Sequence, residues 1–117
     1  MPKSSDSFAD DKHLKHRFAT DVSVLITVRN GERYLQYALD SVLTLAEVHR
    51  PDHVIVVDDG STDFTPNILQ AYSRKFSILF VHTLPPVGRA RALNFGLSRV
   101  TTRFVSILDA DDVSHPE

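Results

Sequence analysis

The chain has 117 residues, 42% of them hydrophobic and 24% charged, which is the composition of one ordinary globular domain. Its formal net charge of −2 excludes a strong general attraction to nucleic acid or to acidic membrane surfaces. The absence of cysteine excludes disulfides and thiolate metal sites, and no apolar run approaches the roughly 20 residues that a transmembrane helix needs.

The first residues are polar and contain no apolar core of a secretory signal. We therefore expect a flexible polar leader over residues 1–20 and a folded domain over residues 21–117, in a cytoplasmic protein. The basic cluster over residues 12–17 leaves an alternative, in which the leader contacts anionic lipid or a partner and holds the protein at the periphery of a membrane.

From residue 21 onward, short apolar strands alternate with helical segments. Val22–Val28 is rich in β-branched residues and almost continuously apolar, which predicts a strand covered on both faces. After a turn at Asn30 and Gly31, apolar residues recur at spacings of three and four, which predicts a helix with one buried stripe. The stripe consists of Leu35, Ala38, Leu39, Val42 and Leu43.

The middle of the chain repeats this alternation. His53–Val57 predicts a second buried strand, which ends in the polar run Asp58–Ser61. A second helix is expected near Thr65, with Thr65 as its N-cap and proline at its first helical position. Its buried side should carry Ile68, Leu69 and Tyr72, and residues 77–81 should form a third strand, followed by a loop over residues 84–88.

The last predicted strand ends in acidic residues. Ala90, Leu93, Leu97 and Val100 mark a third helix, and Phe104–Leu108 the fourth strand. The three carboxylates that follow are Asp109, Asp111 and Asp112. Because like charges so close repel, a hard cation such as Mg²⁺ or Mn²⁺ is their natural partner, and such an ion commonly holds a phosphorylated ligand. The alternative is a solvated acidic turn that caps another helix.

Strands that alternate with helices imply a parallel sheet covered by helices. Ligands bind such sheets beyond the carboxyl ends of the strands, where the strand order reverses. Three predicted strands end in polar clusters, at residues 27–30, 58–61 and 109–112. We expect the topology to bring these clusters together in one site.

A capping-box pattern over residues 114–117 predicts the start of a further helix, which suggests that the chain is the front part of a longer protein.

Several segments resemble the family 2 glycosyltransferases, which have the GT-A fold. Val22–Leu35 resembles the family's opening, Val54–Asp63 its second-strand signature, Gly88–Leu97 the helix before the metal strand, and Ile107–Asp112 the DXD motif. The resemblance implies an α/β, Rossmann-like (GT-A), mostly parallel sheet with helices on both faces, here truncated after the fourth strand. It also implies a nucleotide-diphosphate sugar donor across the carboxyl edge of that sheet.

The resemblance assigns roles to residues near the nucleotide. Thr27 would lie beside the nucleotide, with Asn30 and Glu32 close by. Asp59 would contact the base, usually uracil, whose imide N–H an ionised carboxylate can accept. Asp58 is the neighbour of Asp59 on a strand, so it should face the other way and be structural.

The diphosphate and the metal are assigned in the same way. Arg89 and Arg91 begin the third helix, where guanidinium groups suit a diphosphate. Residues two apart on a helix point in different directions, and Arg91 matches the family's basic position better, so Arg89 is the expected bystander. Asp109 would contact the ribose and the metal, and Asp111 would be the principal ligand of Mn²⁺ or Mg²⁺. Asp112 would either contact the sugar or hold the metal ligands in place. The cation would stabilise the leaving nucleoside diphosphate.

The family's acceptor site and general base belong to a second half, so no catalytic residue can be assigned here. We predict the donor-binding half of an inverting glycosyltransferase that uses a UDP-sugar and an unknown acceptor in cell wall or polysaccharide biosynthesis, inactive as this chain alone. The alternative is a non-catalytic relative that forms a homo-oligomer through surface exposed by truncation. A flavodoxin-like phosphoacceptor domain is disfavoured, because its acidic pair should follow the first strand.

Overall fold

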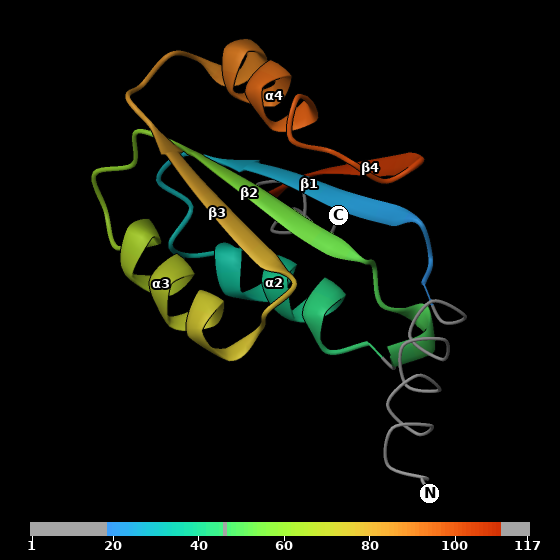
Figure 1. Ribbon diagram of the computed structural model, residues 1–117. Coiled ribbons are helices and arrows are strands. Elements are labelled where there is room, and N and C mark those ends of the chain that lie inside the picture. The colour runs from blue at the N-terminus through green and yellow to red at the C-terminus, as the bar shows by residue number, and fades with distance from the viewer. Residues whose placement is uncertain (1–18, 46, 111–117) are drawn as a thin grey trace, which may run out of the picture.

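The computed structural model describes residues 19–45 and 47–110 of the chain. Its elements are β1 (Val22–Val28), α2 (Leu35–Leu43), the 3-10 helix η1 (Glu47–His49), β2 (His53–Asp59), α3 (Thr65–Lys75), β3 (Leu79–Leu84), α4 (Arg89–Leu97) and β4 (Phe104–Asp109). Figure 1 shows α2 and α3 on one face of the sheet and α4 on the other. The predicted α/β fold with helices on both faces is therefore confirmed. None of the described helices is both long and apolar enough to cross a membrane.

Several sequence-based expectations fall outside this range. Of the expected leader, residues 1–18 are not described, and neither are Asp111, Asp112 or the capping-box pattern over residues 114–117. Thr20 is among the described residues, and its backbone N–H donates to Asp52 Oδ1 at 2.8 Å.

The sheet has four strands in the order β3-β2-β1-β4, and each neighbouring pair is parallel. The chain moves from β1 outward to β3 and then crosses back to place β4 on the other side of β1. Right-handed crossovers in opposite directions place their helices on opposite faces, which explains why α4 lies across from α2 and α3. The order therefore reverses at β1, and the carboxyl ends of β1 and β4 form the switch point.

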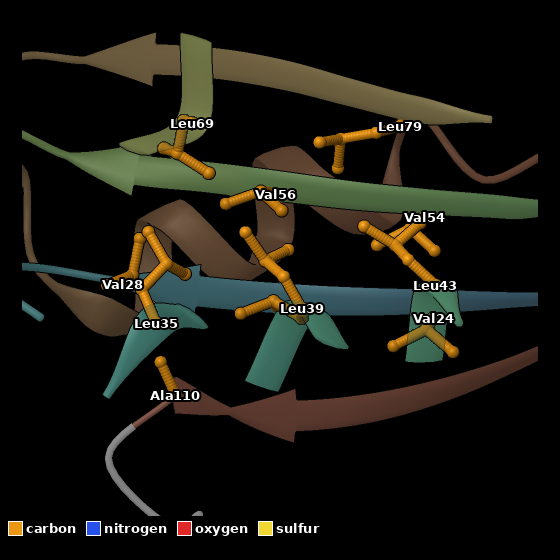
Figure 2. Packing of buried hydrophobic residues seen from close by; sticks show 11 residues of the cluster. Val24, Val28, Leu35, Leu39, Leu43, Val54, Val56, Leu69, Leu79 and Ala110 are labelled. Atoms are coloured by element: carbon orange, nitrogen blue, oxygen red, sulfur yellow. The ribbon is translucent and has the colours of Figure 1, made fainter. Parts of the chain in front are cut away.

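The larger part of the core lies between the sheet and the pair α2 and α3 (Figure 2). Helical residues four apart, Leu35, Leu39 and Leu43, are fully buried, as their spacing predicts. Alternate residues of the strands meet them, because successive strand side chains point to opposite faces. The cluster contains Val24, Ile26, Val28, Leu35, Leu39, Leu43, Val54, Val56, Leu69, Leu79 and Ala110.

A smaller cluster lies beneath α4 and corrects one sequence-based expectation. The residues that α4 buries are Ala92 and Gly96, whereas Ala90 and Leu97 of the expected stripe are exposed. A side chain at position 96 would collide with Leu25 of β1. The helix therefore approaches the sheet through its small residues.

Several boundaries also differ from the sequence-based expectations: β2 and β4 extend to Asp59 and Asp109. The third strand is Leu79–Leu84 rather than residues 77–81. Thr65 is the first residue of α3 rather than its N-cap, which is Phe64. The Thr65 hydroxyl accepts a hydrogen bond from the backbone N–H of Gly31 at 3.0 Å, so it joins two loops and does not cap the helix.

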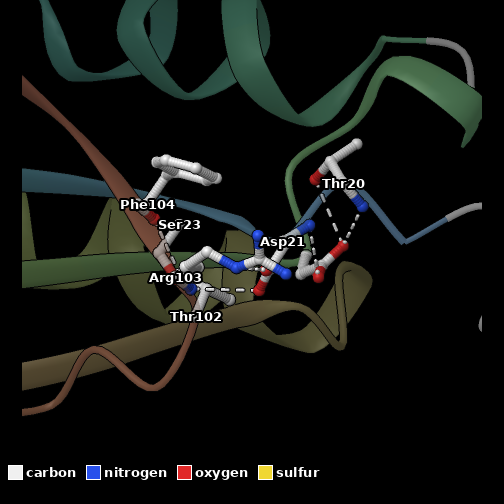
Figure 3. Close-up of polar contacts among 7 residues, drawn as sticks. Thr20, Asp21, Ser23, Thr102, Arg103 and Phe104 are labelled. Atoms are coloured by element: carbon white, nitrogen blue, oxygen red, sulfur yellow. Dashed lines mark hydrogen bonds and ion pairs between the residues drawn. The ribbon is translucent and has the colours of Figure 1, made fainter.

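Polar groups fasten the amino ends of the strands (Figure 3). The carboxylate of Asp52, just before β2, accepts hydrogen bonds from the backbone N–H groups of Thr20 at 2.8 Å and Asp21 at 3.0 Å. Asp21 in turn accepts from the backbone N–H of Arg103, just before β4, and pairs with its Nε, each at 3.0 Å. These ties link β1 to both of its neighbours at the end of the sheet opposite the switch point.

Helices α2 and α3 are joined by a hydrogen bond in which the Tyr72 hydroxyl donates to Asp40 Oδ1 at 2.7 Å. Burial and the neighbouring Asp40 carboxylate raise the pKa of Tyr72 to about 12 from its usual 10.0. A pKa raised on folding contributes stability that is complete below pH 10 and is lost as the pH rises from 10 towards 12.

We expect one of the three tyrosines to ionise later than the others in an alkaline titration followed by ultraviolet absorbance. Tyr72→Phe should remove this late component, because the phenol held by Asp40 is then absent. Tyr37→Phe is the matched control, since Tyr37 is exposed on α2 and this substitution should leave the late component of Tyr72 in place. A late component that persists in Tyr72→Phe would show that the contact with Asp40 does not hold in solution.

Candidate functional site

A small open pocket of about 90 Å³ lies at the switch point. It is lined by Thr27, Val28, Arg29, Asp59, Arg89 and Asp109. These residues come from the ends of β1, β2 and β4 and from the start of α4. The polar clusters expected at residues 27–30, 58–61 and 109–112 thus each contribute to the pocket, through Thr27 and Arg29, through Asp59 and through Asp109.

The strand register explains why these side chains share one face. Thr27 pairs with Val57 of β2 and with Asp109 of β4, so all three point to the same side of the sheet. Asp59 lies two residues beyond Val57 and points the same way. Val57 packs beneath α4, which places Thr27, Asp59 and Asp109 on the α4 face.

Asp59 is buried, with 5% of its surface exposed, and both carboxylate oxygens accept backbone hydrogen bonds. Oδ1 accepts from the N–H of Val87 at 2.8 Å and Oδ2 from the N–H of Gly88 at 3.1 Å. Gly88 is the N-cap of α4 and has a φ of 98°, a conformation that glycine adopts without strain. Two N–H groups at the start of α4 are therefore already bound by protein rather than offered to a ligand.

Asp58 faces the other side of the sheet, as the alternation along the strand predicts. It is fully buried, and its Oδ1 accepts the backbone N–H of Ser61 at 3.1 Å. Its Oδ2 has no hydrogen-bond partner among the described residues. Asp58 therefore shapes the turn after β2 and does not line the pocket.

The two arginines at the start of α4 lie in different surroundings. Arg89 Nε donates to Asp109 Oδ2 at 3.0 Å, with 62% of the Arg89 side chain and 21% of the Asp109 side chain exposed. Arg91 is exposed and does not line the pocket. Residues two apart on a helix point in different directions, and the choice of Arg91 over Arg89 is therefore not supported by the geometry.

Asn30 and Glu32 also lie outside the pocket lining, although both were expected near the nucleotide. Asn30 Oδ1 accepts the backbone N–H of Thr62 at 2.7 Å, and Glu32 Oε1 accepts that of Phe64 at 2.8 Å. Both side chains thus tie the loop after β1 to the loop after β2. Asn30 has a φ of 52°, in the left-handed region that asparagine tolerates better than most residues.

Asp63 strengthens the same connection between the loops. Its Oδ1 accepts the backbone N–H of Thr65 at 2.8 Å and its Oδ2 that of Glu32 at 3.2 Å. Burial acts to raise the pKa of Asp63, but the hydrogen bonds from Thr65 and Glu32 outweigh it and hold the pKa below its usual value. Asp63 is thus an ionised tie between loops and does not line the pocket.

Arg29 and Arg89 line the pocket although neither was selected from the sequence. Arg29 directly follows β1 and belongs to one of the three polar clusters, and this position in the sequence could have identified it as a pocket residue. With Asp59 and Asp109 they give the pocket two cationic and two anionic side chains. A ligand that carries both phosphate oxygens and N–H donors suits this mixture of charges.

Of the expected metal ligands Asp109 and Asp111, Asp109 belongs to the described residues. No group of three or more His, Cys, Asp or Glu residues within the described part of the chain could hold a metal ion. Asp109 contributes one carboxylate at the pocket, whereas Asp111 and Asp112 lie outside the described residues. Carboxylate oxygen is the donor type that Mg²⁺ and Mn²⁺ prefer, so Asp109 fits such an ion when further oxygen ligands join it.

Residues 23–117 match the model of glycosyl transferase family 2. Over 95 residues the chain is 37% identical to an uncharacterized glycosyltransferase of Rickettsia prowazekii, an alignment that covers 81% of this chain and 28% of that protein.

Solved structures show the same similarity. The fold matches S. aureus TarS in complex with UDP-GlcNAc with a TM-score of 0.67 and 32% identity, over 77% of this chain and 26% of that one. It matches a mannosyltransferase of Pyrobaculum calidifontis in complex with GDP-Man and Mn²⁺ with a TM-score of 0.65 and 29% identity, over 78% of this chain and 27% of that one. The chain thus spans about a quarter of the length of the proteins it matches.

We expect Asn30→Ala to lower the free energy of unfolding by about 1–3 kcal/mol, measured by urea denaturation. Alanine loses the hydrogen bonds to the loop after β2 and is strained at a φ of 52°. Asn30→Gly is the matched variant, because it loses the same hydrogen bonds without the strain and should cost less. Equal stability of the two variants would contradict the role given to the backbone conformation, and no loss in either would contradict the tie between the loops.

Proposed function

The chain belongs to glycosyl transferase family 2, and we propose that it forms the donor-binding part of an inverting glycosyltransferase that uses a UDP-sugar. The observation that carries this proposal is the meeting of Thr27, Asp59, Arg89 and Asp109 in one pocket at the switch point of the sheet. A nucleotide-diphosphate sugar offers groups that suit this lining, namely a base with N–H donors, a ribose with hydroxyls and a doubly charged diphosphate.

The nucleoside would occupy the side of the pocket formed by β1 and β2. Thr27 lies at the end of β1 and would contact the nucleotide through its hydroxyl. Asp59 would accept the imide N–H of uracil, because each carboxylate oxygen can accept a second hydrogen bond beside the one from the backbone. S. aureus TarS, which has been solved with UDP-GlcNAc, supports a uracil nucleotide. The archaeal mannosyltransferase solved with GDP-Man makes guanine the alternative to test.

The diphosphate would lie between the start of α4 and the end of β4. We assign its recognition to Arg89 in place of Arg91, because the Arg89 guanidinium reaches the pocket. Asp109 and Asp111 would hold Mn²⁺ or Mg²⁺, and this ion would neutralise the diphosphate and the leaving nucleoside diphosphate. Asn30 and Glu32 would serve the site by fixing the loop beside it rather than by touching the donor.

A non-catalytic relative that forms a homo-oligomer is the second candidate. It is favoured by the outer side of β4, which pairs with no strand among the described residues. Three apolar side chains of this edge strand are exposed, Phe104 by 56%, Val105 by 37% and Ile107 by 47%. Such an edge can pair with a second copy of the chain.

We expect calorimetric titration with UDP to show binding that depends on Mn²⁺. Arg89→Ala, Asp59→Ala and Asp111→Ala should each weaken binding by roughly tenfold or more, because each removes a charged hydrogen-bond partner or a metal ligand. Arg91→Ala is the matched control for Arg89→Ala and should bind as the parent chain does. GDP and ADP, titrated in the same way, measure the preference for the base.

Two outcomes would count against the assignment. Loss of binding in Arg91→Ala but not in Arg89→Ala would restore the arginine predicted from the sequence. Absence of binding to every nucleotide with and without Mn²⁺, together with a dimer in sedimentation analysis, would favour the second candidate.

We also expect the 117-residue chain to transfer no sugar from any UDP-sugar to saccharide acceptors, measured as release of UDP. The physical reason is that the carboxylates lining the described pocket are Asp59 and Asp109, and the proposal gives both to the donor and its metal, which leaves neither as a base for an acceptor hydroxyl. Sustained release of UDP that depends on the acceptor would contradict this part of the proposal.

A further inference from the structure

The connection from β3 to α4 is held to β2 by a single side chain, the carboxylate of Asp59. Its oxygens accept the backbone N–H groups of two consecutive residues, Val87 and Gly88, at 2.8 and 3.1 Å. Hydrogen bonds to an ionised carboxylate are stronger than those between neutral groups, and this one is buried from water. The negative charge also lies at the start of α4, where the helix dipole favours it.

The backbone around this contact is shaped to allow it. Gly60 follows Asp59 directly, has a φ of 67°, and lies so close to Pro86 that a Cβ at position 60 would be 2.6 Å from the proline ring. A larger residue at position 60 would push the loop away from β2. The turn after β2 and the segment before α4 therefore fit together as a pair.

The next residue after this contact is the pocket arginine. Arg89 is the first residue of α4, immediately after Gly88, and its Nε reaches Asp109 of β4 at 3.0 Å. With 62% of the Arg89 side chain exposed, the ion pair itself contributes little to holding the arginine in place. The orientation of Arg89 therefore depends on where the backbone of residues 87 and 88 is held.

We propose that Asp59 and the Val87–Gly88 segment form a latch, in which the carboxylate positions Arg89 over the diphosphate part of the donor pocket. Asp59 is thus a positioning residue for phosphate recognition, in addition to its place beside the base. The effect on donor affinity rests on the proposed function, whereas the latch itself is a property of the chain without ligand.

The test removes one donor of the latch and leaves the carboxylate unchanged. Val87→Pro deletes the N–H that Asp59 Oδ1 accepts, and Val87→Ala is the matched variant that keeps this N–H. Binding is measured by calorimetry with UDP and with inorganic pyrophosphate, each with Mn²⁺. We expect Val87→Pro to weaken both ligands by roughly tenfold, and Val87→Ala to retain most of the affinity.

A double-mutant cycle with Arg89→Ala decides whether the latch acts through the arginine. If it does, Val87→Pro has little further effect once Arg89 is absent. The proposal is overturned if the fold-losses in affinity of Val87→Pro and Arg89→Ala multiply in the double variant, because the two residues then act independently. It is also overturned if Val87→Pro binds both ligands as the parent chain does. Weakened binding of UDP with unchanged binding of pyrophosphate would also overturn it, because Asp59 would then act on the base alone.

A second measurement needs no ligand and separates the latch from the proposed function. In nuclear magnetic resonance spectra, the Nε–Hε signal of Arg89 reports its contact with Asp109. Asp59→Asn and Val87→Pro should both shift this signal towards that of a free arginine, and Val87→Ala should not. An unchanged signal in Asp59→Asn would overturn the latch even if the parent chain binds UDP, and a shift would support it even if no nucleotide binds. Asp59→Asn takes the place of Val87→Pro in the cycle if the proline variant does not fold.

Discussion

The structure depends on the position of β1 between β2 and β4. Because all three strands are parallel, their carboxyl ends meet at one edge, and the crossovers on either side of β1 leave the helices on opposite faces. The space beyond the carboxyl ends of β1 and β4 is left open, because the crossover connections leave β1 in opposite directions there. The pocket forms there because of this topology, before any particular side chain is considered.

The polar groups of the chain are divided between the two ends of the sheet. At the amino ends, Asp21 and Asp52 fix β1 against its neighbours, at the end of the sheet opposite the switch point. At the carboxyl ends, Asn30, Glu32 and Asp63 join the loops after β1 and β2. These ties hold the loops beside the pocket in one arrangement, and an ordered surround reduces the conformational entropy that a ligand must restrict when it binds.

The charged residues of the pocket are not equivalent. Asp59 is buried, and each of its carboxylate oxygens accepts one backbone N–H, so its position is fixed by the fold. Arg89 and Asp109 are more exposed and form an ion pair that a ligand can exchange for contacts of its own. In the proposed donor complex the arginine would release Asp109 to the metal and turn to the phosphates, while the buried carboxylate keeps the start of α4 in place.

The sequence by itself determined the elements and their order. The apolar runs of β1 and β2, the spacing of Leu35, Leu39 and Leu43, and the polar clusters at the strand ends led to the fold class and to the edge where the pocket lies. The resemblance of its motifs to family 2 glycosyltransferases singled out Thr27, Asp59 and Asp109, and all three line the pocket at the switch point.

Only the tertiary structure decided which of the neighbouring polar residues enter the pocket. Arg89 and Arg91 are equivalent in type, and the choice between them depends on the rotation of α4, which buries Ala92 and Gly96 against the sheet. Asn30 and Glu32 are near the site in sequence, yet their side chains accept hydrogen bonds from the loop after β2, from residues 32 positions away. Contacts between distant segments carry no local pattern, and for that reason the sequence could locate the site but not complete it.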